Sequence, residues 1–182
     1  EPEVQGLLAL MLLVQSRQTA RTTPEGDLVL LADQDRRRWD RDLIAEGQDL
    51  VRECLRRNRP GPYQIQAAIN AVHSDAPTAD ATDWRQILQL YDQLEAVAPS
   101  PVVALHRAVA VAEVEGPEAG LAIVATLDLE RYGSFHSVRA DLLRRLGRAE
   151  EAADAYRAAI TCTQNRAERE FLARRRAEVS GR

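Results

Sequence analysis

The stretch Gly61-Pro-Tyr-Gln-Ile-Gln-Ala-Ala-Ile-Asn-Ala-Val-His73 decides the fold, because it joins a helix start to a helical pattern of apolar residues. Gly61 and Pro62 end the preceding segment, and proline suits the first turn of a helix. An apolar stripe follows at helical spacing, formed by Ile65, Ile69 and Val72. A neighbouring face is thin enough for a second helix to approach closely, and it carries Ala67, Ala68 and Ala71. The stretch predicts a scaffold helix with a polar recognition edge formed by Tyr63, Gln64, Gln66, Asn70 and His73.

Beyond this stretch the chain repeats its pattern. Tyr91, Val124 and Tyr156 fall in phase, at a spacing close to the period of about 34 residues of tetratricopeptide helix pairs. The pattern predicts three helix pairs and a final capping helix, over residues 62–98, 101–129, 134–164 and Ala167 to Val179. The third pair is the clearest, because small and large packing residues alternate in it: Ala140, Leu143, Gly147, Ala152, Tyr156 and Ala159. We therefore expect an all-α, tetratricopeptide-like right-handed array of antiparallel helix pairs over residues 61–182, continuous with N-terminal helices in residues 1–60.

Composition agrees with closely packed helices. The chain has 182 residues, of which 45% are hydrophobic and only 4% aromatic, so its core must consist mainly of Leu, Ala and Val. The formal net charge of −4 argues against general attraction to nucleic acid. The longest apolar run, Leu7 to Val14, is too short to span a membrane, and it lacks the flanks of a secretion signal. We expect a cytoplasmic protein without membrane partners, and a fragment of a longer chain, since the sequence begins without Met.

The first 60 residues are less regular. Glu3 to Arg21 is predicted to be a helix that is apolar nearly all round, and therefore buried on more than one side. A turn at residues 22–26 precedes Asp27 to Leu31, which is short and apolar and is a candidate extended segment. A second helix is predicted from about Asp40 to Arg59.

The densest charge cluster of the chain, Asp33-Gln-Asp-Arg-Arg-Arg-Trp-Asp40, precedes that second helix. One interpretation is a helix start with a solvated face of ion pairs. A second is a contact surface in which Trp39 is a partly buried anchor beside arginine side chains. An acid–base pair of carboxylates is a weaker third, because neighbouring arginines would hold the carboxylates ionised and no histidine lies beside them.

No set of residues with an evident catalytic or metal-binding pattern is present. Cys54 and Cys162 lie far apart in helical patterns, which favours buried free thiols over a disulfide or a zinc site. His73, His106 and His136 are isolated in sequence, so we expect helix-packing residues and no metal ligands. Arg174-Arg-Arg176 is interleaved with glutamates, which favours a solvated capping helix over a nucleic-acid contact. We therefore expect no cofactor, no metal and no enzyme activity.

An ordered series of motifs resembles a known family. The series runs through Glu1-Pro-Glu-Val-Gln-Gly-Leu-Leu-Ala-Leu-Met-Leu-Leu13, Asp33-Gln-Asp-Arg36, Arg38-Trp-Asp40, Gly61-Pro-Tyr-Gln-Ile-Gln-Ala-Ala-Ile69, Thr82-Asp-Trp84, Leu90-Tyr-Asp92, Pro99-Ser-Pro-Val-Val103 and Arg107-Ala-Val-Ala-Val111. Across essentially the whole chain, this series is similar to the C-terminal extension of bacterial extracytoplasmic-function RNA polymerase sigma factors. His106 departs from it, since asparagine is expected at that position.

The resemblance implies a regulatory, protein-interacting domain that modulates transcription initiation. Its expected partners are the sigma regions of the same chain and the RNA polymerase core, with DNA contacted only through N-terminal regions absent here. The oligomeric state and the sign of regulation stay open. By analogy, the positions expected to form a shared surface or seam are Asp35, Arg38, Trp39, Tyr63, Gln66 and Trp84.

Two other functions stay open at the level of sequence. A small-molecule-sensing domain would bind an anion or metabolite in a pocket near Arg38, Trp39 and Tyr63, and unpaired arginines in a buried cavity would support it. A hydrolase built on the acidic cluster would require two converging carboxylates and a histidine.

Overall fold

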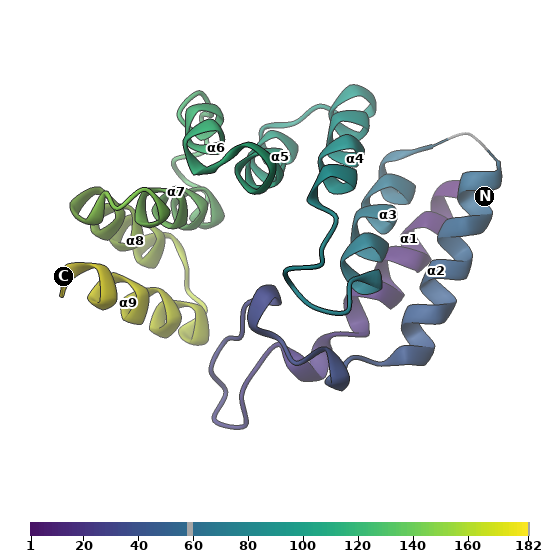
Figure 1. The fold of residues 1–182 in the computed structure, drawn as a ribbon, viewed down its shortest axis with the longest axis horizontal. Helices are drawn as coiled ribbons and strands as arrows, with labels where there is room; N and C mark the ends of the chain where they lie inside the picture. The colour runs from purple at the N-terminus through teal and green to yellow at the C-terminus, as the bar shows by residue number, and fades with distance from the viewer. Residues whose placement is uncertain (58–59, 182) are drawn as a thin grey trace. The chain divides into compact units, whose positions relative to one another are not determined.

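The fold is all-helical over the residues described, 1–57 and 60–181 of a computed structural model. The expected all-α class is confirmed, and Figure 1 shows the helices in chain order. None of the helices in these residues is both long and apolar enough to cross a membrane. The helices are α1 (Pro2–Gln15), α2 (Arg41–Arg56), α3 (Pro62–Asp75), α4 (Trp84–Val97), α5 (Pro101–Glu115), α6 (Pro117–Val124), α7 (Gly133–Arg145), α8 (Ala149–Cys162) and α9 (Arg166–Ser180).

The chain forms two compact units. The first unit comprises Glu1–Glu25 and Val29–Pro99, and the second comprises Gly26–Leu28 and Ser100–Arg182. The structure thus groups residues 61–99 with the N-terminal helices, whereas the sequence pattern grouped them with the later repeats.

In the first unit, α1 packs against both α2 and α3, and α4 packs against α3 (Figure 1). The helices α1 and α3 approach closely where Gly6 meets Gln64. A Cβ atom on Gly6 would lie 2.7 Å from the backbone nitrogen of Gln64, so glycine is required at this crossing. The core of this unit includes Ala9, Leu13, Trp39, Ile44, Val51 and Ala67.

The helix that decides the fold forms as its sequence predicts. α3 begins at Pro62, and its apolar stripe of Ile65, Ile69 and Val72 is buried. Its alanine face is also buried and contributes Ala67, Ala68 and Ala71 to the core shared with α1 and α2. The small side chains of α3 therefore let neighbouring helices pack closely, as predicted.

In the second unit, each helix from α5 to α9 packs against the next one along the chain. Gly116 joins α5 to α6 with a φ of 104°, and Gly147 follows α7 with a φ of 73°, a left-handed conformation that favours glycine. The predicted packing residues of the third pair are buried together between α7, α8 and α9: Ala140, Leu143, Ala152, Tyr156 and Ala159.

Each predicted repeat unit contains one pair of helices. α3 and α4 lie within residues 62–98, α5 and α6 within 101–129, and α7 and α8 coincide closely with 134–164. The predicted capping helix, Ala167 to Val179, lies inside α9. The positions of the helices after residue 60 are therefore confirmed.

Of the predictions for the N-terminal part, the bounds of the first helix are wrong in part. α1 ends at Gln15 and is followed by a short 3₁₀ turn at Gln18–Ala20, because the Ser16 hydroxyl bonds the Leu13 carbonyl and competes with the helix. α1 is buried on more than one side, as predicted, because it packs against both α2 and α3, and its exposed side carries Val4, Leu8 and Met11. The candidate extended segment from Asp27 to Leu31 is extended in part, with an isolated β-bridge at Leu28 and an extended backbone at Leu30, and a 3₁₀ turn begins at its last residue.

The second predicted helix is α2, which begins after Asp40. The Asp40 carboxylate accepts hydrogen bonds from the backbone N–H groups of Asp42 and Leu43, 3.0 and 3.1 Å away, and so caps the helix. α2 ends at Arg56, and residues 58 and 59 of the predicted helix lie outside the described part.

Candidate functional site

Trp39 is the centre of the candidate site. It lies just before α2, its side chain is only 3% exposed, and it joins the core of the first unit. Trp39 is therefore a core residue, more deeply buried than the partly buried anchor of a contact surface that the sequence suggested. Its indole Nε1 is buried and has no hydrogen-bond partner in the described residues.

Two arginines cover the Trp39 ring. The guanidinium carbon of Arg36 lies 4.5 Å from the ring centre, and that of Arg17 lies 5.9 Å from it. Contacts of this kind stabilise a cation against the face of an aromatic ring. Arg36 and Arg17 are both buried, and neither was among the residues singled out from the sequence.

Arg36 also fixes the end of α3. Its Nη1 donates to the backbone carbonyls of His73 and Ala76, at 2.7 and 2.9 Å. These carbonyls belong to the last turn of α3 and its C-cap, where a positive charge is favoured. Arg36 therefore holds the charged loop against α3.

His73 and Trp84 extend this arrangement. The His73 imidazole meets the Trp84 ring edge-on at the start of α4, with the ring centres 5.3 Å apart. Burial, together with the charges of Arg17 and Arg36, lowers the pKa of His73 to about 4, so its ring is neutral at pH 7. The expected packing role of His73 is confirmed. We call the set Arg17, Arg36, Trp39, Asn70, His73 and Trp84 the arginine–tryptophan cluster.

Asp35 and Arg38, both predicted for the site, make their contacts outside the arginine–tryptophan cluster. The Asp35 carboxylate accepts two hydrogen bonds from the side chain of Arg37, at 3.0 Å, and these lower the pKa of Asp35. The Arg38 guanidinium donates to the carbonyl of Thr19, and the Thr19 hydroxyl donates to the carbonyl of Arg38 at 2.8 Å. Arg38 therefore ties the loop to the segment after α1.

Tyr63 and Gln66 lie in the first half of α3. Ten residues of helix separate Tyr63 from His73, which corresponds to about 15 Å at 1.5 Å per residue. The Tyr63 side chain is exposed, and its backbone N–H donates to the Glu3 carboxylate at 3.0 Å. Gln66 is half-buried, and its carbonyl accepts from the Asn70 side chain at 2.9 Å. Of the six predicted residues, the structure connects Trp39 and Trp84 alone. Arg36 lies over the Trp39 ring and bonds the His73 carbonyl, and the His73 ring contacts Trp84.

The two cysteines differ. Cys54 is buried in α2, where desolvation raises the pKa of its thiol, and this position was predicted correctly. Cys162 is exposed at the end of α8, so its predicted burial is wrong. No group of three or more metal-ligating side chains that could hold a metal ion occurs in residues 1–57 and 60–181.

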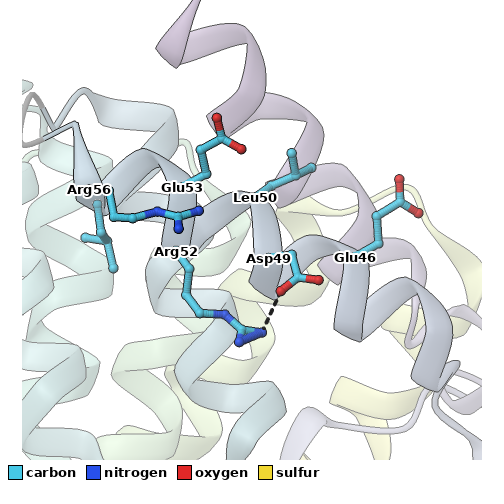
Figure 2. A pocket seen from close by; sticks show the side chains of 7 residues that line it. Glu46, Asp49, Leu50, Arg52, Glu53 and Arg56 are labelled. Atoms are coloured by element: carbon cyan, nitrogen blue, oxygen red, sulfur yellow. Dashed lines mark ion pairs between the residues drawn. The ribbon is translucent and has the colours of Figure 1, made fainter.

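Among the hollows on the surface of the first unit, two differ clearly in character. The outer face of α2 forms a shallow hollow lined by both acidic and basic side chains, and Figure 2 shows Arg52 paired with Asp49, at 3.0 Å. Both partners of this pair are exposed, which limits its contribution to stability.

A second hollow of about 340 Å³ lies over α3, between α2 and α4. It has an apolar floor and a polar rim, and its lining includes Val51, Leu55, Ala68, Leu90, Gln48 and Gln86. Neither hollow is lined by a member of the arginine–tryptophan cluster.

Comparisons with known proteins found a family model and a relative that match this chain. Residues 1–55 match the model of a family of unknown function, DUF6596, and these residues include α1, the charged loop and most of α2. The chain is 49% identical over 174 residues to an uncharacterized protein of Rhizobium meliloti (strain 1021), covering 94% of this chain and 41% of that protein. The chain thus spans about two fifths of the length of the curated relative it matches. No solved structure matches.

Proposed function

We propose that the chain is the C-terminal regulatory domain of an extracytoplasmic-function RNA polymerase sigma factor, and that it acts in the cytoplasm through protein contacts and not by catalysis. The ordered motifs from Glu1 to Val111 that resemble such extensions support this proposal. The three predicted helix pairs and the final helix support a tetratricopeptide-like arrangement of the domain.

The exposed apolar face of α1 carries the proposal. Val4 is 61% exposed, Leu8 45% and Met11 60%, and these residues follow one another at helical spacing on one side of the helix. Leu7 adds to the same exposed group. We call Val4, Leu7, Leu8 and Met11 the α1 apolar face. A run of large exposed apolar side chains on one helix is typical of a protein interface.

The sigma regions of the same longer protein are the proposed occupant of the α1 apolar face. The curated relative contains more than twice the length that this chain matches, so a long part of such a protein is available as an intramolecular partner. Contact with a covalently linked partner benefits from a high effective concentration, so a modest apolar surface is sufficient. RNA polymerase core contacts would then be modulated through the sigma regions.

Promoter output from the full-length parent tests this contact. Replacing Leu8 and Met11 with glutamate should change reporter transcription several-fold, because a buried charge opposes docking. Both side chains are exposed, so the fold of the domain should be retained, as measured by circular dichroism. Val97→Glu is the matched control, since Val97 is an exposed apolar residue of α4 outside this face. Transcription equal to that of the parent in the double variant would reject the proposed surface.

Deleting residues 1–182 from the parent gives the sign of regulation. Lost output, with the sigma regions still folded, would identify a positive element. Raised output would identify an inhibitor.

The geometry does not favour the alternative of a small-molecule-sensing domain with a pocket formed by Arg38, Trp39 and Tyr63. The Arg38 guanidinium is hydrogen-bonded to the Thr19 carbonyl, and Tyr63 lies at the opposite end of α3 from His73 of the arginine–tryptophan cluster. These three side chains therefore do not converge on one ligand.

A further inference from the structure

The arginine–tryptophan cluster concentrates positive charge inside the first unit. Arg17 and Arg36 are 7% and 8% exposed, and both lie over the same indole ring. Arg21 and Arg41 add positive charge close by, since they lower the pKa of Arg17 and of Arg36, respectively. This concentration occurs in a chain whose net charge is negative.

The two buried guanidinium groups make hydrogen bonds to neutral oxygens. Arg17 donates to the side-chain oxygen of Asn70 at 2.6 Å, and Arg36 donates to the carbonyls of His73 and Ala76. Among the described residues, neither group forms an ion pair. The nearest acidic residues along the loop are engaged elsewhere, Asp35 with Arg37 and Asp40 with the start of α2.

An uncompensated buried charge is costly. Removing a cation from water without an opposite charge costs several kcal/mol in proteins. Burial and the neighbouring arginines lower the pKa of Arg17 to about 10, which still leaves it charged at pH 7. A bound negative charge would offset this cost.

Two N–H donors of the cluster remain available. Arg17 Nη1 and Trp39 Nε1 are both buried, and neither has a hydrogen-bond partner among the described residues. The Arg17 guanidinium carbon lies 5.9 Å from the centre of the Trp39 ring, so the two unpaired donors belong to side chains that lie against each other. Because both atoms are enclosed by the chain, an acceptor here must be compact.

We propose that the arginine–tryptophan cluster binds one small monovalent anion, chloride or a short carboxylate such as formate, between Arg17 Nη1 and Trp39 Nε1. The anion neutralises part of the charge of Arg17 and Arg36. It thereby secures the loop that carries Trp39 to the ends of α1 and α3. This site does not depend on the proposed role in transcription.

The test is unfolding of the 182-residue chain by urea at pH 7 and constant ionic strength. Sodium gluconate, whose anion is too bulky for the site, is exchanged stepwise for sodium chloride in one series and sodium formate in another. Binding to the folded state alone lowers the unfolding equilibrium constant by the factor 1 + [L]/Kd. We expect about a tenfold decrease when the anion concentration reaches ten times its Kd, with saturation above it. The series with the lower Kd identifies the preferred anion.

Arg17→Gln should abolish the dependence, because the amide can still bond to Asn70 but carries no charge. Arg157→Gln, at an exposed arginine paired with Asp154 in α8, is the matched control and should keep the full dependence. Equal anion dependence in Arg17→Gln and the parent would overturn the proposal.

A direct readout covers the case in which Arg17→Gln does not fold. Trp84→Phe leaves Trp39 as the single tryptophan of the chain, so its indole N–H gives one NMR resonance. That resonance should move in a saturable way with chloride or formate. An unchanged chemical shift over both titrations would show that no anion binds the Trp39 indole N–H, and would overturn the proposal.

Discussion

Trp39 is the largest side chain in the core of the first unit, and its removal should be costly. Trp39→Ala should lower the free energy of unfolding by about 3–5 kcal/mol, since it leaves a cavity and uncovers two arginines. Urea denaturation measures this change. Trp84→Ala is the comparison, because Trp84 is half-buried and should cost less. A loss below about 0.5 kcal/mol for Trp39→Ala would contradict the burial of this ring.

His73 should make the stability of the first unit depend on pH. Its folded pKa of about 4 lies below its ordinary value of 6.5, so the unfolded chain binds the proton more tightly. Stability from the neutral ring is fully present above pH 6.5 and is lost as the pH falls from 6.5 towards 4, by at most about 3 kcal/mol. The measurement is urea unfolding at several pH values in this window. His73→Gln should flatten the curve, and identical slopes in parent and variant would contradict the assignment.

The single residues of the site were only partly predictable. Trp39 was found because a lone aromatic residue among charges is typical of an anchor. Arg36 was not found, because the side chains of Arg36, Arg37 and Arg38 are chemically identical and all three residues lie in one 3₁₀ turn. Three consecutive residues of such a turn point in three directions, so only one faces the core, and tertiary packing alone selects it. Arg17 was missed because it belongs to a different segment.

The crossing of α1 and α3 sets a limit on side-chain size. Gly6→Ala would place a Cβ atom 2.7 Å from the Gln64 backbone nitrogen and 2.9 Å from its Cα, so the helices must separate. We expect a loss of about 1–3 kcal/mol, measured by urea unfolding. Gly133→Ala is the control, because the added Cβ atom would make only ordinary contacts of 3.5 Å or more. Equal stability of Gly6→Ala and the parent would show that α1 moves freely over α3.

Helix positions followed from the sequence more readily than helix environments did. Proline starts, glycine ends and apolar spacing act within a few residues, which is why α3 to α9 lie where they were expected. The exposed side of α1 was not predicted, because its sequence is apolar nearly all round. Such a pattern cannot tell a helix enclosed by its own domain from one that presents a face to a partner.

At the scale of the whole molecule, each unit contains a core of its own. The second unit buries apolar residues in two clusters, one including Leu105, Val124 and Phe135, the other Leu143 and Tyr156. Residues 100–182 should therefore fold alone, with a helical circular dichroism spectrum and a cooperative thermal transition. Residues 1–99 are the matched fragment. A non-cooperative loss of signal from 100–182 would show that this unit requires the first for its structure.

The domain boundary was hidden in the sequence for a physical reason. α3 and α4 share the helical pattern of the later pairs, so periodicity joined residues 61–99 to them. α3 packs against α1 and α2, which have no such periodicity, and α4 packs against α3. Contacts between segments far apart in the chain decide which helices belong together, and repeat spacing does not record them.

The hydrogen bonds of Arg36 also determine which substitutions the first unit can tolerate. Arg36 donates to the main-chain carbonyls of His73 and Ala76, and every amino acid offers such a carbonyl. Positions 73 and 76 can therefore change their side chains without breaking these bonds, within the space available. Arg36 has no such freedom, since lysine lacks the planar group that reaches two carbonyls and lies flat on an indole. The joint between the charged loop and α3 therefore depends on Arg36, whereas the side chain of His73 matters for stability through its separate contact with Trp84.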